Sequence, residues 1–179
     1  IDLFRFQNCS GSSGYQWNET PRKSWIINPF VLGYNKYSNF SPAFQAELDS
    51  SEYLRNSFQS VFLEGENVSF IYNNQDELHK QHFHYFRANF EESGLLLQGI
   101  DEALKGLSGN KTDFEKLTTL KYSKYIKLDG EYKHYHIQLH SSLVTRAYAG
   151  IAIPVGGSPV VPYIKQFFAG GPNSMRAWR

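Results

Sequence analysis

The sequence has a single cysteine, no long apolar run and almost no net charge. Each of these features argues against one class of protein. The single cysteine, Cys9, cannot form an internal disulfide, which argues against a small extracellular disulfide-bonded domain. No apolar run reaches the roughly 18 residues of a membrane-spanning helix, but a spanning β-strand needs only about 9–11 residues, half of them polar. The net charge is +1, and the basic residues are scattered among acidic ones, which argues against nucleic acid as a partner.

Sequence motifs of catalysis are also missing. Serine, histidine and aspartate all occur, but no strand–turn–helix segment carries a nucleophile elbow. The glycine pairs at 156–157 and 170–171 lack the Lys-Ser/Thr dipeptide and the following helix of a phosphate-binding loop. We therefore expect neither an enzyme nor a bound cofactor.

Apolar residues, many of them aromatic, alternate with polar residues along much of the chain, which is typical of β-strands. This pattern predicts strands over residues 8–17, 24–36, 62–73, 82–92, 122–139 and 143–153. Pro29 lies inside the second of these, where it removes a ladder hydrogen bond. Ser41 is a favourable N-cap and Pro42 a favourable first helical residue, so a short loop helix is expected near 42–48, with a second turn near 52–58.

The connections between these strands alternate in length. Those near 18–22, 74–80 and 140–142 are short, whereas those near 38–60, 94–121 and from 154 onward are long. Short periplasmic turns and long extracellular loops are the layout of an antiparallel transmembrane β-barrel, here a fragment of about six strands. A soluble β-sandwich binding module would also show alternating strands, and the strand pattern alone does not exclude it.

Charged residues are concentrated on one face of the later strands. In a barrel this face belongs to the lumen, because Lys or Arg at the lipid midplane costs about 2–4 kcal/mol. Leu128 and Tyr132 alternate with these charges and are expected to face lipid. The residues expected to face the lumen are Arg87, Glu91, Lys127, Asp129, Glu131, Lys133 and Arg146.

Four histidines allow two interpretations. His82 and His84 share a strand face, as do His134 and His136, and imidazoles at such spacing on neighbouring strands can ligate zinc. The alternative is an interfacial belt, in which amphipathic rings lie at the level of the lipid headgroups. We expect the belt and no metal site.

The stretch Gln166 to Trp178 reads QFFAGGPNSMRAW. It resembles the sixth extracellular loop of the BamA/TamA superfamily of outer-membrane assembly barrels, in which a glycine pair and a polar spacer precede an aliphatic residue, Arg, Gly and an aromatic residue. The resemblance implies that the arginine is held in the barrel lumen by acidic residues of neighbouring strands. The matching positions are Gly170, Gly171, Met175, Arg176, Ala177 and Trp178, with Met in place of Val or Ile and Ala in place of Gly.

Two further segments, NETPRKSW at 18–25 and SPAFQ at 41–45, look like the TamL-type branch of TamA-related proteins in Bacteroidota. The resemblance implies a factor in the outer membrane of a Gram-negative bacterium that inserts or exports client proteins. Residues 1–179 are expected to form the central part of one barrel domain and to end in the arginine-bearing loop, with periplasmic domains and terminal strands absent.

The same resemblance implies a set of partners and leaves other functions open. The implied partners are unfolded outer-membrane client proteins, outer-membrane lipids, and a TamB-like periplasmic protein or accessory lipoproteins. The alternatives within membrane proteins are a two-partner-secretion transporter and a passive porin. The alternative of a different class is the soluble β-sandwich binding module.

Overall fold

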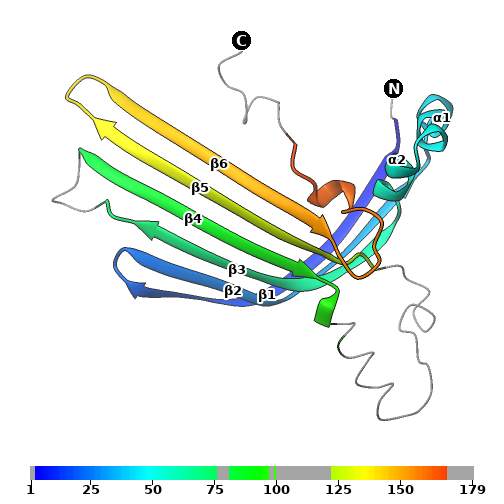
Figure 1. Ribbon diagram of the computed structural model, residues 1–179, viewed down its shortest axis with the longest axis horizontal. Coiled ribbons are helices and arrows are strands. Elements are labelled where there is room, and N and C mark those ends of the chain that lie inside the picture. Colours follow the sequence, from blue (N-terminus) through cyan, green and yellow to red (C-terminus); the bar gives the residue numbers. More distant parts are fainter. Residues whose placement is uncertain (1–2, 76–80, 97–98, 100–121, 169–179) are drawn as a thin grey trace.

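The computed structural model describes residues 3–75, 81–96, 99 and 122–168, which form a single six-stranded antiparallel sheet in sequence order (Figure 1). Its strands are β1 (Arg5–Thr20), β2 (Lys23–Ser38), β3 (Val61–Asn73), β4 (His82–Ser93), β5 (Tyr125–Ile137) and β6 (Ser142–Pro154). The predicted all-β antiparallel class is confirmed. In the described part of the chain, no helix has the length and apolar character needed to cross a membrane.

The antiparallel order sends the short and the long connections to opposite ends of the sheet (Figure 1). The turns between β1 and β2 and between β5 and β6 lie at one end, here termed the turn end. Helices α1 (Pro42–Ser50) and α2 (Glu52–Ser57) lie at the other, the loop end, with the residues that follow β4 and β6. The predicted alternation is confirmed for the described connections, whereas residues 76–80 of the short 74–80 connection and most of the 94–121 insertion lie outside the described residues.

The loop helices form where the sequence predicts them. Ser41 caps α1, because its hydroxyl accepts a hydrogen bond from the Phe44 amide at 3.3 Å, and Pro42 begins the helix. Ser51 caps α2 in the same way through the Leu54 amide at 3.4 Å. Each cap satisfies a backbone donor that a helix leaves unpaired at its start.

Pro29 is accommodated by a β-bulge in β2. The pairing with β1 shifts register between Ser13 and Tyr15, and the pairing with β3 shifts between Asn28 and Val31. In both cases β2 has one residue more than its partner strand. A bulge leaves a position without ladder hydrogen bonds, which is where a central strand tolerates proline.

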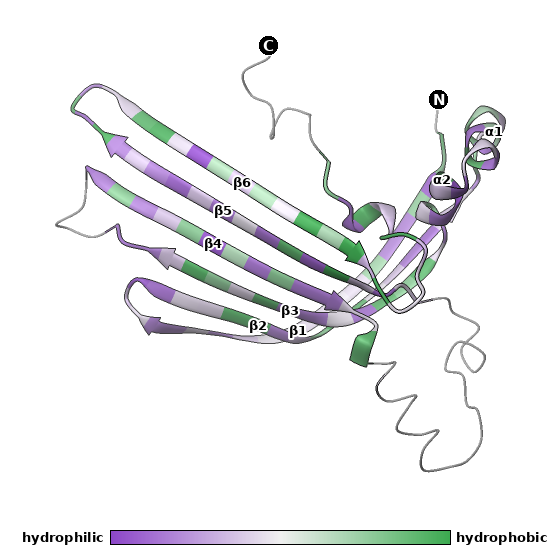
Figure 2. Cartoon of the chain, in the orientation of Figure 1, coloured by the Kyte–Doolittle hydropathy of each residue, from purple (hydrophilic) through white to green (hydrophobic). Residues whose placement is uncertain are grey.

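The two faces of the sheet differ in composition and exposure. Cross-strand neighbours form an unbroken apolar row on one face, the outer face, made of Tyr15, Ile27, Val68, Phe90, Leu128 and Ile151. Leu128 and Ile151 are 51% and 54% exposed, whereas Asp129 and Glu131 on the opposite, inner face are 8% and 6% exposed. The alternation of apolar and polar residues is visible along the strands in Figure 2.

Buried apolar residues form two small clusters, both at the loop end. One contains Val61, Leu63, Tyr125 and Val161, and the other contains Tyr37, Leu48 and Phe58. The first joins the sheet to the residues that follow β6, and the second joins β2 to α1 and α2. The loop end is therefore packed, while the outer face remains uncovered along most of its length.

Candidate functional site

A network of charged side chains covers the inner face of β4, β5 and β6, with Glu131 at its centre. The Glu131 carboxylate accepts a hydrogen bond from Arg146 Nε at 2.6 Å and lies 3.2 Å from Lys133 Nζ. Arg87 approaches both Glu131 and Asp129 to 3.8 Å. Burial of two carboxylates is favourable only where cations and hydrogen bonds compensate for lost hydration, as they do here.

A ladder of amide and hydroxyl groups extends this polar surface toward β2. Asn89 donates to Asp129 at 3.1 Å and accepts hydrogen bonds from Asn67 and Ser69 at 2.8 and 2.6 Å. Asn67 in turn accepts from Asn28 across β2 and β3 at 3.4 Å. The inner face therefore carries connected polar side chains from β2 to β6, as expected of a surface in contact with water.

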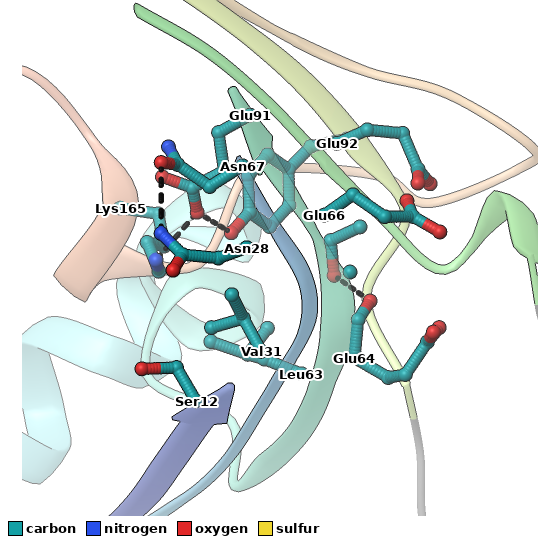
Figure 3. A pocket seen from close by; sticks show the side chains of 13 residues that line it. Ser12, Asn28, Val31, Leu63, Glu64, Glu66, Asn67, Glu91, Glu92 and Lys165 are labelled. Atoms are coloured by element: carbon teal, nitrogen blue, oxygen red, sulfur yellow. Dashed lines mark hydrogen bonds and ion pairs between the residues drawn. The ribbon is translucent and has the colours of Figure 1, made fainter. Parts of the chain in front are cut away.

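Residues 155–168, here termed the strap, follow β6 and lie on the inner face at the loop end (Figure 1). The strap includes the short helix η1 (Tyr163–Lys165). Lys165 forms an ion pair with Glu91 of β4, and the same carboxylate accepts a hydrogen bond from the Tyr125 hydroxyl at 2.6 Å (Figure 3). Lys127 adds a hydrogen bond to the Lys165 carbonyl at 3.1 Å, so β4 and β5 both hold η1.

The strap also reaches α2 on the other side of the loop end. The Tyr163 ring stacks on Phe58, with centroids 4.5 Å apart, and the Gln166 amide donates to the Ser57 hydroxyl at 3.1 Å. Phe167 lies against Gly150, where a Cβ atom would come within 2.5 Å of the ring. Glycine at that position therefore allows the ring to approach β6.

A cavity of about 230 Å³ opens beside the Lys165–Glu91 pair (Figure 3). Amide groups of Asn28 and Asn67 line it with the hydroxyl of Ser12 and the ion pair itself. Asn28 precedes the β-bulge, so the cavity lies where β2 departs from regular pairing with β3. The lining is suited to water and hydrogen-bonding groups.

The histidines meet across β4 and β5 on the outer face at the turn end. The Nδ1 atoms of His82 and His136 are 2.9 Å apart, and the His84 and His134 rings stack with centroids 4.7 Å apart. Among the described residues, no group of three or more histidine, cysteine or acidic side chains has the geometry to hold a metal ion. The His84 Nδ1 atom instead lies 2.7 Å from the Tyr132 hydroxyl, which joins the histidines to the aromatic outer face.

The register places the sequence-predicted charges together on the inner face, although whether that face lines a closed barrel stays a prediction. These residues are Arg87, Glu91, Lys127, Asp129, Glu131, Lys133 and Arg146. The motif residues Gly170, Gly171, Met175, Arg176, Ala177 and Trp178 lie outside the described residues. Sequence reasoning missed Lys165 and Tyr125, which have no local pattern to mark their shared contact with Glu91.

Sequence comparison identifies one related family. A family model described as the Omp85 superfamily domain matches residues 32–179, which is most of the chain. Comparison with curated proteins and with solved structures yields no match.

Proposed function

The chain belongs to the Omp85 superfamily, and we propose that its sheet forms part of the wall of an outer-membrane β-barrel that inserts or exports client proteins. Membership implies an outer-membrane protein with a general role in protein assembly or secretion. The observation that carries the proposal is the reversal of the usual burial pattern. Carboxylates are buried on the inner face, while large apolar residues are exposed on the outer face.

This reversal favours lipid as the environment of the outer face. In water a contiguous exposed apolar surface marks an interaction site or an aggregation hazard, whereas in a bilayer it is the low-energy arrangement. The edge strands β1 and β6 each have one edge without a partner strand in the sheet. Unpaired backbone groups in hydrocarbon cost several kcal/mol each. We infer that both edges pair with further strands and so close the barrel.

The proposed activity involves no bond-making chemistry. A client strand would pair with an exposed strand edge of the barrel, which lowers the barrier to placing unpaired backbone groups in lipid. The proposed partners are unfolded outer-membrane proteins, outer-membrane lipids, and a TamB-like periplasmic protein or accessory lipoproteins. The similarity of segments 18–25 and 41–45 to the TamL-type branch supports assembly over other roles within the superfamily.

Depletion of the protein in its host tests this function. We expect the abundance of several integral outer-membrane barrels to fall together, measured by quantitative mass spectrometry of the outer-membrane fraction. Loss of one exported protein alone would instead identify a two-partner-secretion type transporter. An unchanged outer-membrane proteome with reduced uptake of small solutes would identify a passive porin.

The motif arginine offers a second test of the same function. In the superfamily-like loop, Arg176 is proposed to face lumenal carboxylates, and its guanidinium group would fix the direction of the loop. Arg176→Ala should therefore reduce the folded fraction or client assembly, measured by gel mobility with and without heating and by client abundance. Arg55→Ala, an exposed arginine on α2, is the matched control and should leave both unchanged.

A further inference from the structure

We propose that the histidines at the turn end of the outer face, together with the hydroxyl and amide groups beside them, bind the phosphate of a phospholipid headgroup. The inference rests on the proposed function, since it assumes that the outer face contacts lipid. It goes beyond that function by naming a ligand, the end of the barrel that holds it and a dependence on pH. The site lies on β4, β5, β6 and the turn between the last two (Figure 1).

An aromatic row on the outer face sets the level of the site along the barrel wall. The Trp17 and Trp25 rings stack with centroids 6.4 Å apart, and Trp25 lies 4.8 Å from Phe70. Phe86 continues the row at 6.3 Å from Phe70 and pairs with Tyr132 across β4 and β5. Aromatic girdles of this kind mark the border between hydrocarbon and headgroups in a barrel. The row therefore places this border near the turn end.

The histidines lie just beyond the aromatic row, toward the turn end. The first pair, His84 and His134, occupies the next outer position on β4 and β5, and the second pair, His82 and His136, occupies the one after it. Successive outer positions on a strand are about 7 Å apart. The imidazole rings therefore reach the level of the headgroups rather than that of the acyl chains.

A shallow pocket of about 490 Å³ opens beside the histidines of β5, where the chain turns into β6. Imidazolium, amide and hydroxyl groups all donate hydrogen bonds to phosphate oxygens. Leu143 adds an apolar wall, which suits the glycerol and the first carbons of an acyl chain. The polar lining consists of His134, His136, Gln138, Ser141, Ser142 and Thr145.

Hydrogen bonds within the turn hold these donors in place. The Gln138 amide donates to the Ser141 carbonyl at 2.8 Å, and the Ser141 hydroxyl donates to the Gln138 side-chain carbonyl at 3.2 Å. The Gln138 side-chain nitrogen lies 3.0 Å from His136 Nε2, so the turn also contacts the histidines. The pocket is thus formed without a ligand, which lowers the entropic cost of binding one.

The contact between His82 and His136 explains why an anion is preferred. Their Nδ1 atoms are 2.9 Å apart and can share a hydrogen bond only while one of them carries no proton. When both rings are protonated, both nitrogens are donors, and a phosphate oxygen that accepts from them relieves the conflict. Histidine changes its charge between about pH 5 and 8. Binding of an anionic headgroup should therefore strengthen as the pH falls.

No carboxylate opposes an anion at this position. Among the described residues, the outer face of β3 to β6 carries no acidic side chain at the turn end. The titratable neighbours are Tyr72 on β3 and Tyr132, whose hydroxyl lies 2.7 Å from His84 Nδ1. Lys23, which pairs with Tyr72, and His140 in the turn can only add positive charge. The surroundings therefore favour a negatively charged ligand.

Native mass spectrometry of the intact protein in detergent tests the site. Phosphatidylglycerol is the probe, and diacylglycerol with the same acyl chains is the control that lacks phosphate. Gain or loss of a hydrogen bond to a charged group changes an equilibrium by about tenfold or more. Lowering the pH from about 8 to about 5 should therefore tighten phosphatidylglycerol binding about tenfold and leave diacylglycerol binding unchanged.

Substitution by tyrosine separates a phosphate site from a belt of interfacial rings. Tyrosine suits the lipid interface but cannot become cationic. His134→Tyr with His136→Tyr should weaken phosphatidylglycerol binding about tenfold at the lower pH and remove the pH dependence. Thr145→Val keeps the shape of the side chain, removes one hydroxyl donor and should weaken binding about threefold. His140→Ala, an exposed histidine outside the pocket lining, is the matched control and should bind like the unaltered protein.

Equal binding of phosphatidylglycerol and diacylglycerol, or equal phosphatidylglycerol affinity at both pH values, would overturn the site and leave the histidines as a belt. Displacement of the lipid by inorganic phosphate at the same concentration would overturn the lipid as the ligand, since phosphate has no acyl chains. The proposed assembly function is judged separately by the depletion experiment, and the binding experiment requires no client. The headgroup site can therefore fail while assembly stands, and the reverse.

Discussion

Leu128→Lys tests the environment of the outer face directly, because water and lipid predict destabilisations of different size. Leu128 belongs to the apolar row and lies between Phe90 of β4 and Ile151 of β6. The nearest side chains along β5 on the same face are those of Ile126 toward the loop end and, beyond Gly130, Tyr132 toward the turn end. Leu128 is 51% exposed, so lysine would meet no steric obstacle on either interpretation.

The expected free-energy change separates the two environments. A surface substitution in water changes the free energy of unfolding by about 0.5 kcal/mol or less. A lysine near the lipid midplane instead destabilises a barrel by about 2–4 kcal/mol. We expect the larger value, measured by reversible urea titration of the intact protein in phospholipid vesicles with tryptophan emission as the signal.

The matched control is Leu139→Lys, since Leu139 is a 93% exposed leucine in the turn between β5 and β6. It lies outside the apolar rows and should tolerate lysine in both environments. If Leu128→Lys and Leu139→Lys agree within about 0.5 kcal/mol, the outer face does not contact lipid and the membrane assignment is wrong.

Two further predictions concern the inner face and the strand pairing. Glu131→Ala should destabilise the protein by about 1–3 kcal/mol, because three cations lose their shared buried carboxylate, whereas the exposed helical Glu47→Ala should have little effect in the same titration. Equal stability of these two variants would show that the network contributes nothing. Gly65→Ala should cost about 1–3 kcal/mol or more, because its Cβ would lie 1.9 Å from the Glu92 carbonyl oxygen. Gly11→Ala places its Cβ in open space, and a Gly65→Ala variant as stable as Gly11→Ala would contradict the register of β3 with β4.

Much of the fold is predictable from local signals in the sequence. A strand with water on one face and an apolar environment on the other must alternate polar and apolar residues. Each strand can therefore be predicted from its own segment of the sequence. The N-cap at Ser41 and the proline that follows it together specify where α1 begins. Turn and loop lengths then order the strands, because an antiparallel meander places successive connections at alternate ends.

The docking of the strap is a different case. Lys165 and Glu91 are 74 residues apart, and their contact depends on the path that the chain takes after Pro154. No periodic pattern extends over residues 155–168, because a strap that crosses a sheet meets different strands at successive positions. The charges of the inner face could therefore be assigned from alternation, whereas the particular charge that receives Lys165 could not.

The β-bulge at Pro29 keeps the apolar residues of β2 on the outer face, although their alternation in the sequence changes phase at this point. Uninterrupted alternation from Leu32 back along β2 would turn Trp25 and Ile27 to the inner face, since residues two apart share a face. The extra residue in β2 reverses this parity, and Trp25 instead packs on the outer face against Phe70, with ring centroids 4.8 Å apart. Without the bulge, one half of β2 would place apolar side chains among the polar groups of the inner face. Proline favours the bulge because it cannot donate a hydrogen bond to the neighbouring strand. Pro29 therefore allows the apolar side chains in both halves of β2 to lie on the outer face.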